Sequence, residues 1–225
     1  MCMTGTVLSD LDVTARVDPR HWRVLLGRLH ATFLTGSFDS GLRLLGRIAA
    51  AAQELDHHPD VDLRYPAVHV GLVSHDANGL TERDVALAAR ISAAADDLGV
   101  PADTAVPLAL EVAVDALDID AVRPFWKAVL GYEDEPPPAP DASPALRDPA
   151  GRGPAVWFQQ MDAPRPQRNR IHIDVTVPHD VAEARVRAAI DAGGHLVSDA
   201  SAPAFWVLAD AEGNEACVCT WQGRA

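Results

Sequence analysis

The sequence predicts an α+β fold in two domains: an antiparallel sheet with helices on one face, followed by a domain of two βαβββ repeats. Three observations predict it. In the first half, two helical patterns of apolar residues flank a stretch in which apolar residues alternate. A short segment rich in proline and glycine comes next. The second half then shows a strand, a helix and further strands twice over, which indicates an internal repeat.

Composition limits the classes of function. The chain has 225 residues, enough for two domains with their own cores, and its 48% apolar and 23% charged residues are typical of a globular protein. The formal net charge of −13 argues against nucleic-acid binding, because neutralising phosphates needs clustered lysine and arginine. Neither a leader pattern nor an apolar run of about 18 residues is present, so we expect a cytoplasmic protein without membrane contact. We expect Cys2, Cys217 and Cys219 to be reduced thiols.

The first half begins with a polar segment of weak helical character, residues 1–20, and then a strand over 22–33 with a turn at Gly27. Ser37 is a suitable N-cap for the first long helix. That helix should end at a histidine pair, because Pro59 disfavours helical geometry at the residue before it.

Residues 60–74 alternate as a strand, with Val68, Val70 and Leu72 on one face and His69 and His75 on the other. A turn follows at residues 78–79. A capping box made of a threonine and an aspartate, positions 81 and 84, then introduces a helix over 85–98.

The segment 101–107 is expected to be a linker between a first domain, 1–100, and a second, 108–225. Each repeat of the second domain opens with a strand and a helix. In the first repeat these are 108–114 and 119–130, then a proline-rich loop over 133–149 and a strand over 155–161. In the second they are 170–177 and 179–192, then strands near 195–197, 204–208 and 216–221.

Four histidines lie between Gln53 and Asp84: His57, His58, His69 and His75. Imidazole titrates near neutral pH, so this cluster is where proton transfer is most expected. The spacings typical of structural or HExxH zinc sites are absent from it.

The same segment resembles the signature of the pterin-4a-carbinolamine dehydratase family, and the similarity extends over about residues 15–98. The signature is an acidic or similar residue, His-His-Pro after three residues, an aromatic residue, His after nine more, and then Asp. It is matched by Gln53, His57, His58, Pro59, Tyr65, His75 and Asp84.

The resemblance implies a hydro-lyase that needs no cofactor and acts on a small pterin. It implies His57 and His75 as the acid and base, His58 as a positioning group or second proton donor, and Asp84 as an orienting group. Substrate-binding roles fall to three further positions of the signature, Gln53, Pro59 and Tyr65. The first position is usually acidic; the amide here accepts a hydrogen bond but cannot hold a charge on a neighbouring imidazolium. On structural grounds alone, His58 would simply end a helix and Asp84 would only cap the next one.

The second half resembles a glyoxalase-like domain of the vicinal-oxygen-chelate superfamily, through FWKAVLGYE (125–133), RIHIDVTV (170–177) and VLADAEGNEACVCTW (207–221). In that superfamily, metal ligands sit on the first and last strand of each repeat. The matching positions are Glu111, Gln159 or Gln160, His172 and Cys217. Glutamine is a weak ligand and a thiolate suits Zn²⁺ better than Mg²⁺ or Mn²⁺, so we expect a metal-free cup holding an unknown ligand, with Glu111 and His172 as weak metal candidates.

The leading hypothesis is therefore dehydration of 4a-hydroxytetrahydrobiopterin or a related pterin. An alternative is a small-molecule binding protein, in which the second domain sequesters a ligand and the first serves oligomerisation. A less favoured alternative is a metal-dependent lyase, isomerase or dioxygenase in the second domain. Both families commonly self-associate, which implies a homo-oligomer.

Overall fold

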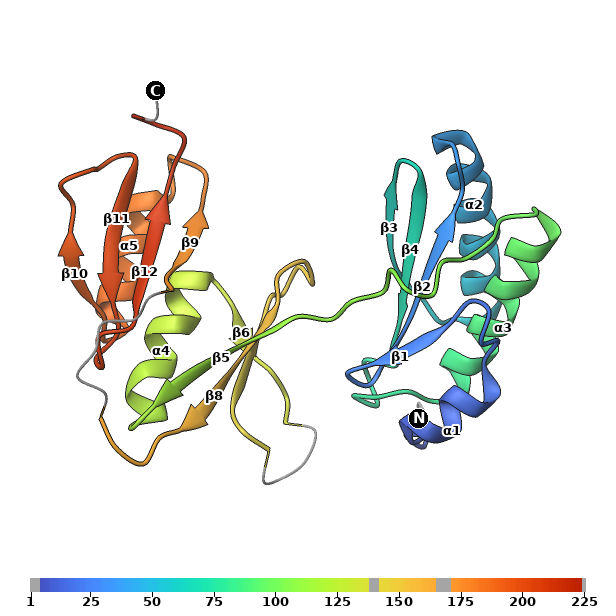
Figure 1. The fold of residues 1–225 in the computed structure, drawn as a ribbon, viewed down its shortest axis with the longest axis horizontal. Helices are drawn as coiled ribbons and strands as arrows, with labels where there is room; N and C mark the ends of the chain where they lie inside the picture. The colour runs from blue at the N-terminus through green and yellow to red at the C-terminus, as the bar shows by residue number, and fades with distance from the viewer. Residues whose placement is uncertain (1–4, 138–141, 165–170, 224–225) are drawn as a thin grey trace. The chain divides into compact units, whose positions relative to one another are not determined.

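The computed structural model describes residues 5–137, 142–164 and 171–223, and it divides into two compact units, Met1–Ala109 and Leu110–Ala225 (Figure 1). Cys2, residues 138–141 of the expected proline-rich loop and Arg170 of an expected strand lie outside the described residues. In the part of the chain that is described, no helix has both the length and the apolar character to cross a membrane.

The first unit is an antiparallel sheet with its two long helices on one face (Figure 1). The strand order is β1-β2-β4-β3, and every neighbouring pair is antiparallel. In chain order the elements are α1 (Asp10–Arg16), β1 (Arg23–Leu25), β2 (Arg28–Leu34), α2 (Phe38–Leu55), β3 (Asp60–Arg64), β4 (Ala67–Leu72) and α3 (Glu82–Asp97).

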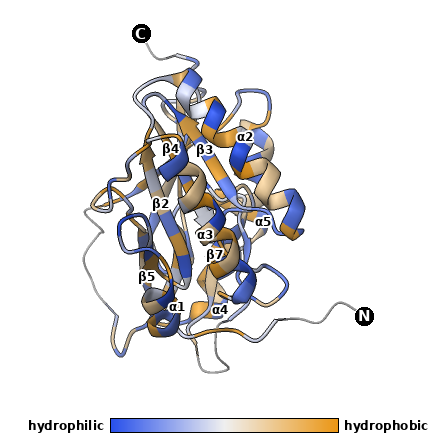
Figure 2. Ribbon diagram, turned by 90° about the vertical axis from the view of Figure 1, so that its right-hand side faces the viewer, coloured by the Kyte–Doolittle hydropathy of each residue, from blue (hydrophilic) through white to orange (hydrophobic). Residues whose placement is uncertain are grey.

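Apolar residues of the strands and of the helices form one hydrophobic core in this unit. Alternate residues of β2 and β4 point toward the helices, and the apolar stripes of α2 and α3 cover them. Figure 2 shows hydrophilic and hydrophobic stretches alternating along α2. The core contains Leu29, Phe33, Leu44, Ile48, Val68, Val70, Leu72, Leu87 and Ile91, each at most 2% exposed.

One expected strand is two strands. Residues 60–72 form the hairpin β3–β4, with a turn at Tyr65–Pro66, and His75 lies beyond the end of β4 in the turn that follows. His75 therefore does not share a strand face with His69. The expected linker also begins later than 101. The backbone N–H of Leu34 donates to the carbonyl oxygen of Pro101, and Ala102 forms an isolated antiparallel β-bridge with Phe33.

The second unit contains two four-stranded sheets of identical topology, one from each repeat. Their orders are β5-β8-β7-β6 and β9-β12-β11-β10, so the first and last strand of each repeat are parallel neighbours. In chain order the elements are β5 (Glu111–Ala116), α4 (Ile119–Leu130), β6 (Glu133–Asp134), β7 (Ala145–Arg147), β8 (Ala155–Gln160), β9 (Ile173–Thr176), α5 (Ala182–Asp191), β10 (His195–Ser198), β11 (Phe205–Ala209) and β12 (Glu215–Cys219).

The expected α+β architecture with two βαβββ repeats is thus confirmed. The stretch 133–149 differs from the expected loop, since it contributes the short strands β6 and β7. Helices α4 and α5 pack on each other in one core with the two sheets, through Val122, Phe125 and Val186. A buried aspartate also links the repeats: Asp210 accepts a hydrogen bond at 3.0 Å from the indole Nε1 of Trp126.

Candidate functional site

The first unit holds a buried hydrogen-bond network around Asp84, whose side chain is fully buried. One carboxylate oxygen, Oδ1, lies 2.8 Å from the Nε2 atom of His57, which is 7% exposed. The other, Oδ2, accepts hydrogen bonds from the Ser74 hydroxyl at 2.7 Å and from the backbone N–H of Thr81 at 2.7 Å. These contacts hold the carboxylate in place, and the carboxylate in turn fixes the orientation of the His57 imidazole.

Two helix ends bring these groups together. Helix α2 ends with Asp56 in the left-handed conformation, and His57 donates its backbone N–H to Ala52. Helix α3 begins with the expected capping box, in which the Thr81 side chain caps the helix and the Asp84 carboxylate accepts a hydrogen bond from the Thr81 backbone N–H. Asp84 thus lies in the first turn of α3, where the helix dipole favours a negative charge.

His58 is exposed and has a different partner. Its Nε2 atom lies 3.0 Å from the Nε2 atom of Gln53, one turn from the end of α2. An amide nitrogen can only donate, so in this arrangement His58 accepts. Pro59 is half-buried and directly precedes β3.

His75 is exposed in the turn between β4 and α3. Ser74 and Gly79 close this turn by backbone hydrogen bonds, and Asp76 pairs with Arg83 of α3. The Arg83 guanidinium lowers the pKa of Asp76. The turn that carries His75 is therefore tied to the helix that carries Asp84.

The structure does not bring Tyr65 to the histidines. Asp60 pairs with Gly71 and Arg64 with Ala67, so His58 and His75 lie near one end of the hairpin and Tyr65 at the other. At about 3.3 Å per residue, β3 spans roughly 13 Å. Tyr65 is 72% exposed. Ser74 was missed by sequence reasoning, because a hydroxyl before a histidine carries no signal of its own.

Two further histidines lie on the sheet face away from the helices. His69 places its Nδ1 atom 3.0 Å from the Thr32 hydroxyl, a contact between β4 and β2. His30 is half-buried on β2, and burial, with a smaller effect of Arg28, lowers its pKa below the usual 6.5. Neither residue belongs to the Asp84 network.

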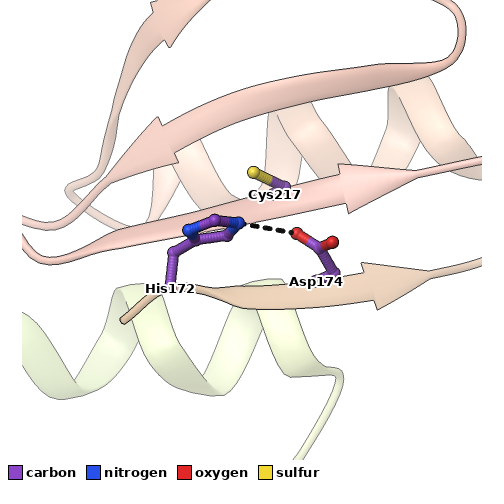
Figure 3. Close-up of side chains that lie close together, drawn as sticks. All are labelled: His172, Asp174 and Cys217. Carbon is purple, nitrogen blue, oxygen red and sulfur yellow. Dashed lines mark ion pairs between the residues drawn. The ribbon is translucent and has the colours of Figure 1, made fainter. Parts of the chain in front are cut away.

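The second unit brings His172, Asp174 and Cys217 together (Figure 3). Asp174 on β9 is directly opposite Cys217 on β12, and His172 lies two residues before Asp174. The His172 Nε2 and Asp174 Oδ1 atoms are 3.4 Å apart. Cys217 is 6% exposed, and burial, followed by the charge of Asp174, raises the pKa of its thiol to about 11.

A cavity of about 610 Å³ adjoins this group. It is lined by His172, Asp174, Ser201, Ala204, Phe205, Cys217, Cys219 and Gly223. Within the described residues, the weak metal candidate Glu111 lies on the other sheet and is not part of the group. Gln160 is also engaged elsewhere, since its amide donates to Leu117 and Met161. The third member of the group is Asp174, which sequence reasoning did not name as a ligand.

Comparison with known proteins divides the chain in the same way. Residues 6–94 match the family model of pterin 4 alpha carbinolamine dehydratase, and residues 111–219 match that of a glyoxalase-like domain. A putative pterin-4-alpha-carbinolamine dehydratase of Herpetosiphon aurantiacus is 43% identical over 67 residues, which cover 30% of this chain and 70% of the relative. A protein of the same description from Chloroflexus aurantiacus is 36% identical over 85 residues, 37% of this chain and 91% of the relative.

Among solved structures, a transcriptional coactivator/pterin dehydratase from Brucella melitensis is 26% identical. The alignment covers 40% of this chain and 99% of that one, with a TM-score of 0.38.

Proposed function

The chain belongs to the pterin-4-alpha-carbinolamine dehydratase family through residues 6–94, and we propose that this domain dehydrates a 4a-hydroxytetrahydropterin. The substrate is a small molecule, 4a-hydroxytetrahydrobiopterin or a related pterin. The products are the quinonoid dihydropterin and water. The glyoxalase-like domain follows as a separate unit.

The observation that carries this proposal is the buried pair of His57 and Asp84. A carboxylate only accepts hydrogen bonds, so Nε2 of His57 bears the hydrogen that points at Asp84. The Nδ1 atom is then the nitrogen of His57 that is left for the substrate. An imidazole oriented by a buried carboxylate is a recurrent arrangement for proton transfer.

The reaction requires two proton movements and no change of oxidation state. The hydroxyl on carbon 4a leaves as water after receiving a proton, and the neighbouring ring nitrogen N5 loses a proton as the double bond forms. We assign these transfers to His57 and His75, each contributing on the order of 10² to 10⁴ in rate. His58 positions the pterin, and Asp84 acts through His57.

The proposal is tested by the decay of enzymatically generated 4a-hydroxytetrahydropterin, followed by ultraviolet absorbance. We expect the wild type to accelerate the decay and His75→Ala to lose most of that effect. His195→Ala, which changes an exposed histidine of the second unit, is the matched control and should retain it. A wild-type protein that leaves the decay unchanged would refute the proposal.

Gln53 offers a second test. A glutamate there would face His58 across the present 3.0 Å, and a charge at that distance in a water-like dielectric changes an equilibrium by up to about tenfold. Because both side chains are exposed, salt reduces the effect. We expect Gln53→Glu to accelerate the decay by a few-fold to about tenfold. An unchanged rate would mean that the charge on His58 does not matter to the reaction.

A second candidate function belongs to the other unit. Its cavity of about 610 Å³ falls within the range of small-molecule sites, which favours ligand binding there. If binding were the only function of the chain, His57→Ala would leave carbinolamine decay in the presence of the protein unchanged. A loss of acceleration in that variant refutes the binding-only alternative.

A further inference from the structure

The side chains of His172, Asp174 and Cys217 converge because of their place in the second repeat. Alternate residues of a strand share a face, so His172 and Asp174 point the same way, and the parallel register places Cys217 beside them. Figure 3 shows the imidazole, the carboxylate and the thiol turned toward one common space. Their potential ligand atoms all lie within 4.8 Å of one another.

These separations fit a tetrahedral zinc ion. Zinc binds nitrogen, oxygen and sulfur at about 2.0–2.3 Å, so its ligand atoms lie about 3.3–3.8 Å apart. The distance of 3.4 Å between His172 and Asp174 is already in that range. The other separations lie within 4.8 Å, at most about 1 Å beyond that range. Rotation of His172 and Asp174, whose side chains are each 55% exposed, can close this gap without moving the strands.

We propose that His172, Asp174 and Cys217 bind one Zn²⁺ ion within the second repeat. The chemistry of the donors selects the ion, because a thiolate and an imidazole suit Zn²⁺, whereas Mg²⁺ and Mn²⁺ prefer oxygen ligands. On binding, the Cys217 sulfur bonds to the metal as a thiolate and its proton is released to solvent. Three protein ligands leave one position of a tetrahedral ion for water or a cavity ligand.

Two of these ligands, His172 and Cys217, stand at positions that the superfamily uses, whereas Asp174 does not. The superfamily takes ligands from both repeats, whereas the three groups here all come from β9, the residue preceding it and β12. Glu111 of the first repeat is outside the group among the residues that the structure describes. The proposal goes beyond the dehydratase function and does not depend on it.

Metal binding is measured directly on the full chain, after chelator treatment and removal of the chelator. Titration with Zn²⁺ in a calorimeter should give one ion per chain. Titration with Co²⁺ should give the near-ultraviolet absorption band of thiolate-to-cobalt charge transfer, which Zn²⁺ then abolishes by displacement. Absence of stoichiometric Zn²⁺ binding, or of the cobalt band, would overturn the proposal.

Variants locate the ion. Cys217→Ser should abolish the cobalt band, and Asp174→Asn should weaken Zn²⁺ binding at least about 100-fold while leaving the metal-free protein folded. Cys219→Ser is the matched comparison, since this thiol lies two residues away on the same strand and lines the same cavity but is outside the group. It should keep the band. A band that survives Cys217→Ser contradicts the assignment.

Two further variants exclude other locations for the ion. Glu111→Gln should leave Zn²⁺ affinity unchanged, and a loss there would show that the site spans both repeats. His75→Ala should also leave it unchanged, and a loss would place the ion at the histidines of the first unit.

Discussion

Replacing Asp84 with asparagine tests the role of the buried carboxylate with a change of one atom. The three donors that reach Oδ2, the Ser74 hydroxyl and the backbone and side chain of Thr81, require an oxygen there. The amide nitrogen introduced by Asp84→Asn would therefore occupy the place of Oδ1 and point at His57. Since an amide nitrogen only donates, Nε2 of His57 would have to accept, and its hydrogen would move to Nδ1.

Two different costs follow from this change. Hydrogen bonds to a charged acceptor are stronger than those to a neutral one, so we expect a loss of about 1–3 kcal/mol in the free energy of unfolding. A domain with a typical stability of about 5–15 kcal/mol would remain folded. The dehydration rate should fall much more, by about 10² to 10⁴, because the nitrogen facing the substrate would carry the wrong protonation.

Urea unfolding gives the first quantity and carbinolamine decay gives the second. Nitrogen NMR of the imidazole would report the tautomer of His57 directly. Asp97→Asn is a matched control, since it makes the same change at an exposed position at the end of the same helix. A folded Asp84→Asn protein with a rate within about threefold of the wild type would refute the orienting role.

Three other predictions concern stability. Ser74→Ala removes a buried donor to Asp84 and should lower the unfolding free energy by about 1–2 kcal/mol in urea; a neutral effect would mean that water replaces the hydroxyl. Burial lowers the pKa of His30, so the unfolded chain binds a proton at this residue more readily than the folded chain. The contribution of His30 to the unfolding free energy is therefore fully present above about pH 6.5 and is lost as the pH falls below that value. His30→Gln should make this decline smaller when unfolding curves at pH 5 and pH 7 are compared. Trp126→Phe leaves the buried Asp210 without one donor and should cost about 1–3 kcal/mol by thermal or urea unfolding, which an unchanged midpoint would contradict.

Local chemistry made several elements predictable. Ser37 caps α2, and Gly131 in the left-handed conformation follows α4 at Leu130, as their residue types indicate. The capping box at Thr81 and Asp84 is confirmed as well. Each of these helix ends is set by residues that are close together in the chain, so it can be predicted from the sequence alone.

The hairpin β3–β4 was missed although a signal exists. Val61 and Leu63 pack against the core from β3, whereas Val68, Val70 and Leu72 do so from β4. The inward positions therefore change from odd to even numbers across Tyr65–Pro66, which a single strand cannot do. Pro66 in this turn is a second signal, because proline is disfavoured inside a central strand and common in turns.

The group in the second unit could not be assembled from sequence. Alternation indicates that His172 and Asp174 share a face, but the contact with Cys217 depends on the pairing of β9 with β12. Parallel partners in this repeat are separated by a helix and two strands, so no local pattern sets their register. Which residue joins His172 and Cys217 was therefore a question of tertiary structure.

The parallel pairing of β9 with β12 also bears on how quickly the second unit folds and unfolds. These strands open and close their repeat, so joining them carries the loop-closure cost of everything between, and we expect their contact to form late in folding. Interactions that are absent from the transition state change the unfolding rate and leave the folding rate nearly untouched. Whatever binds across these two strands would therefore lengthen the lifetime of the folded unit rather than hasten its formation.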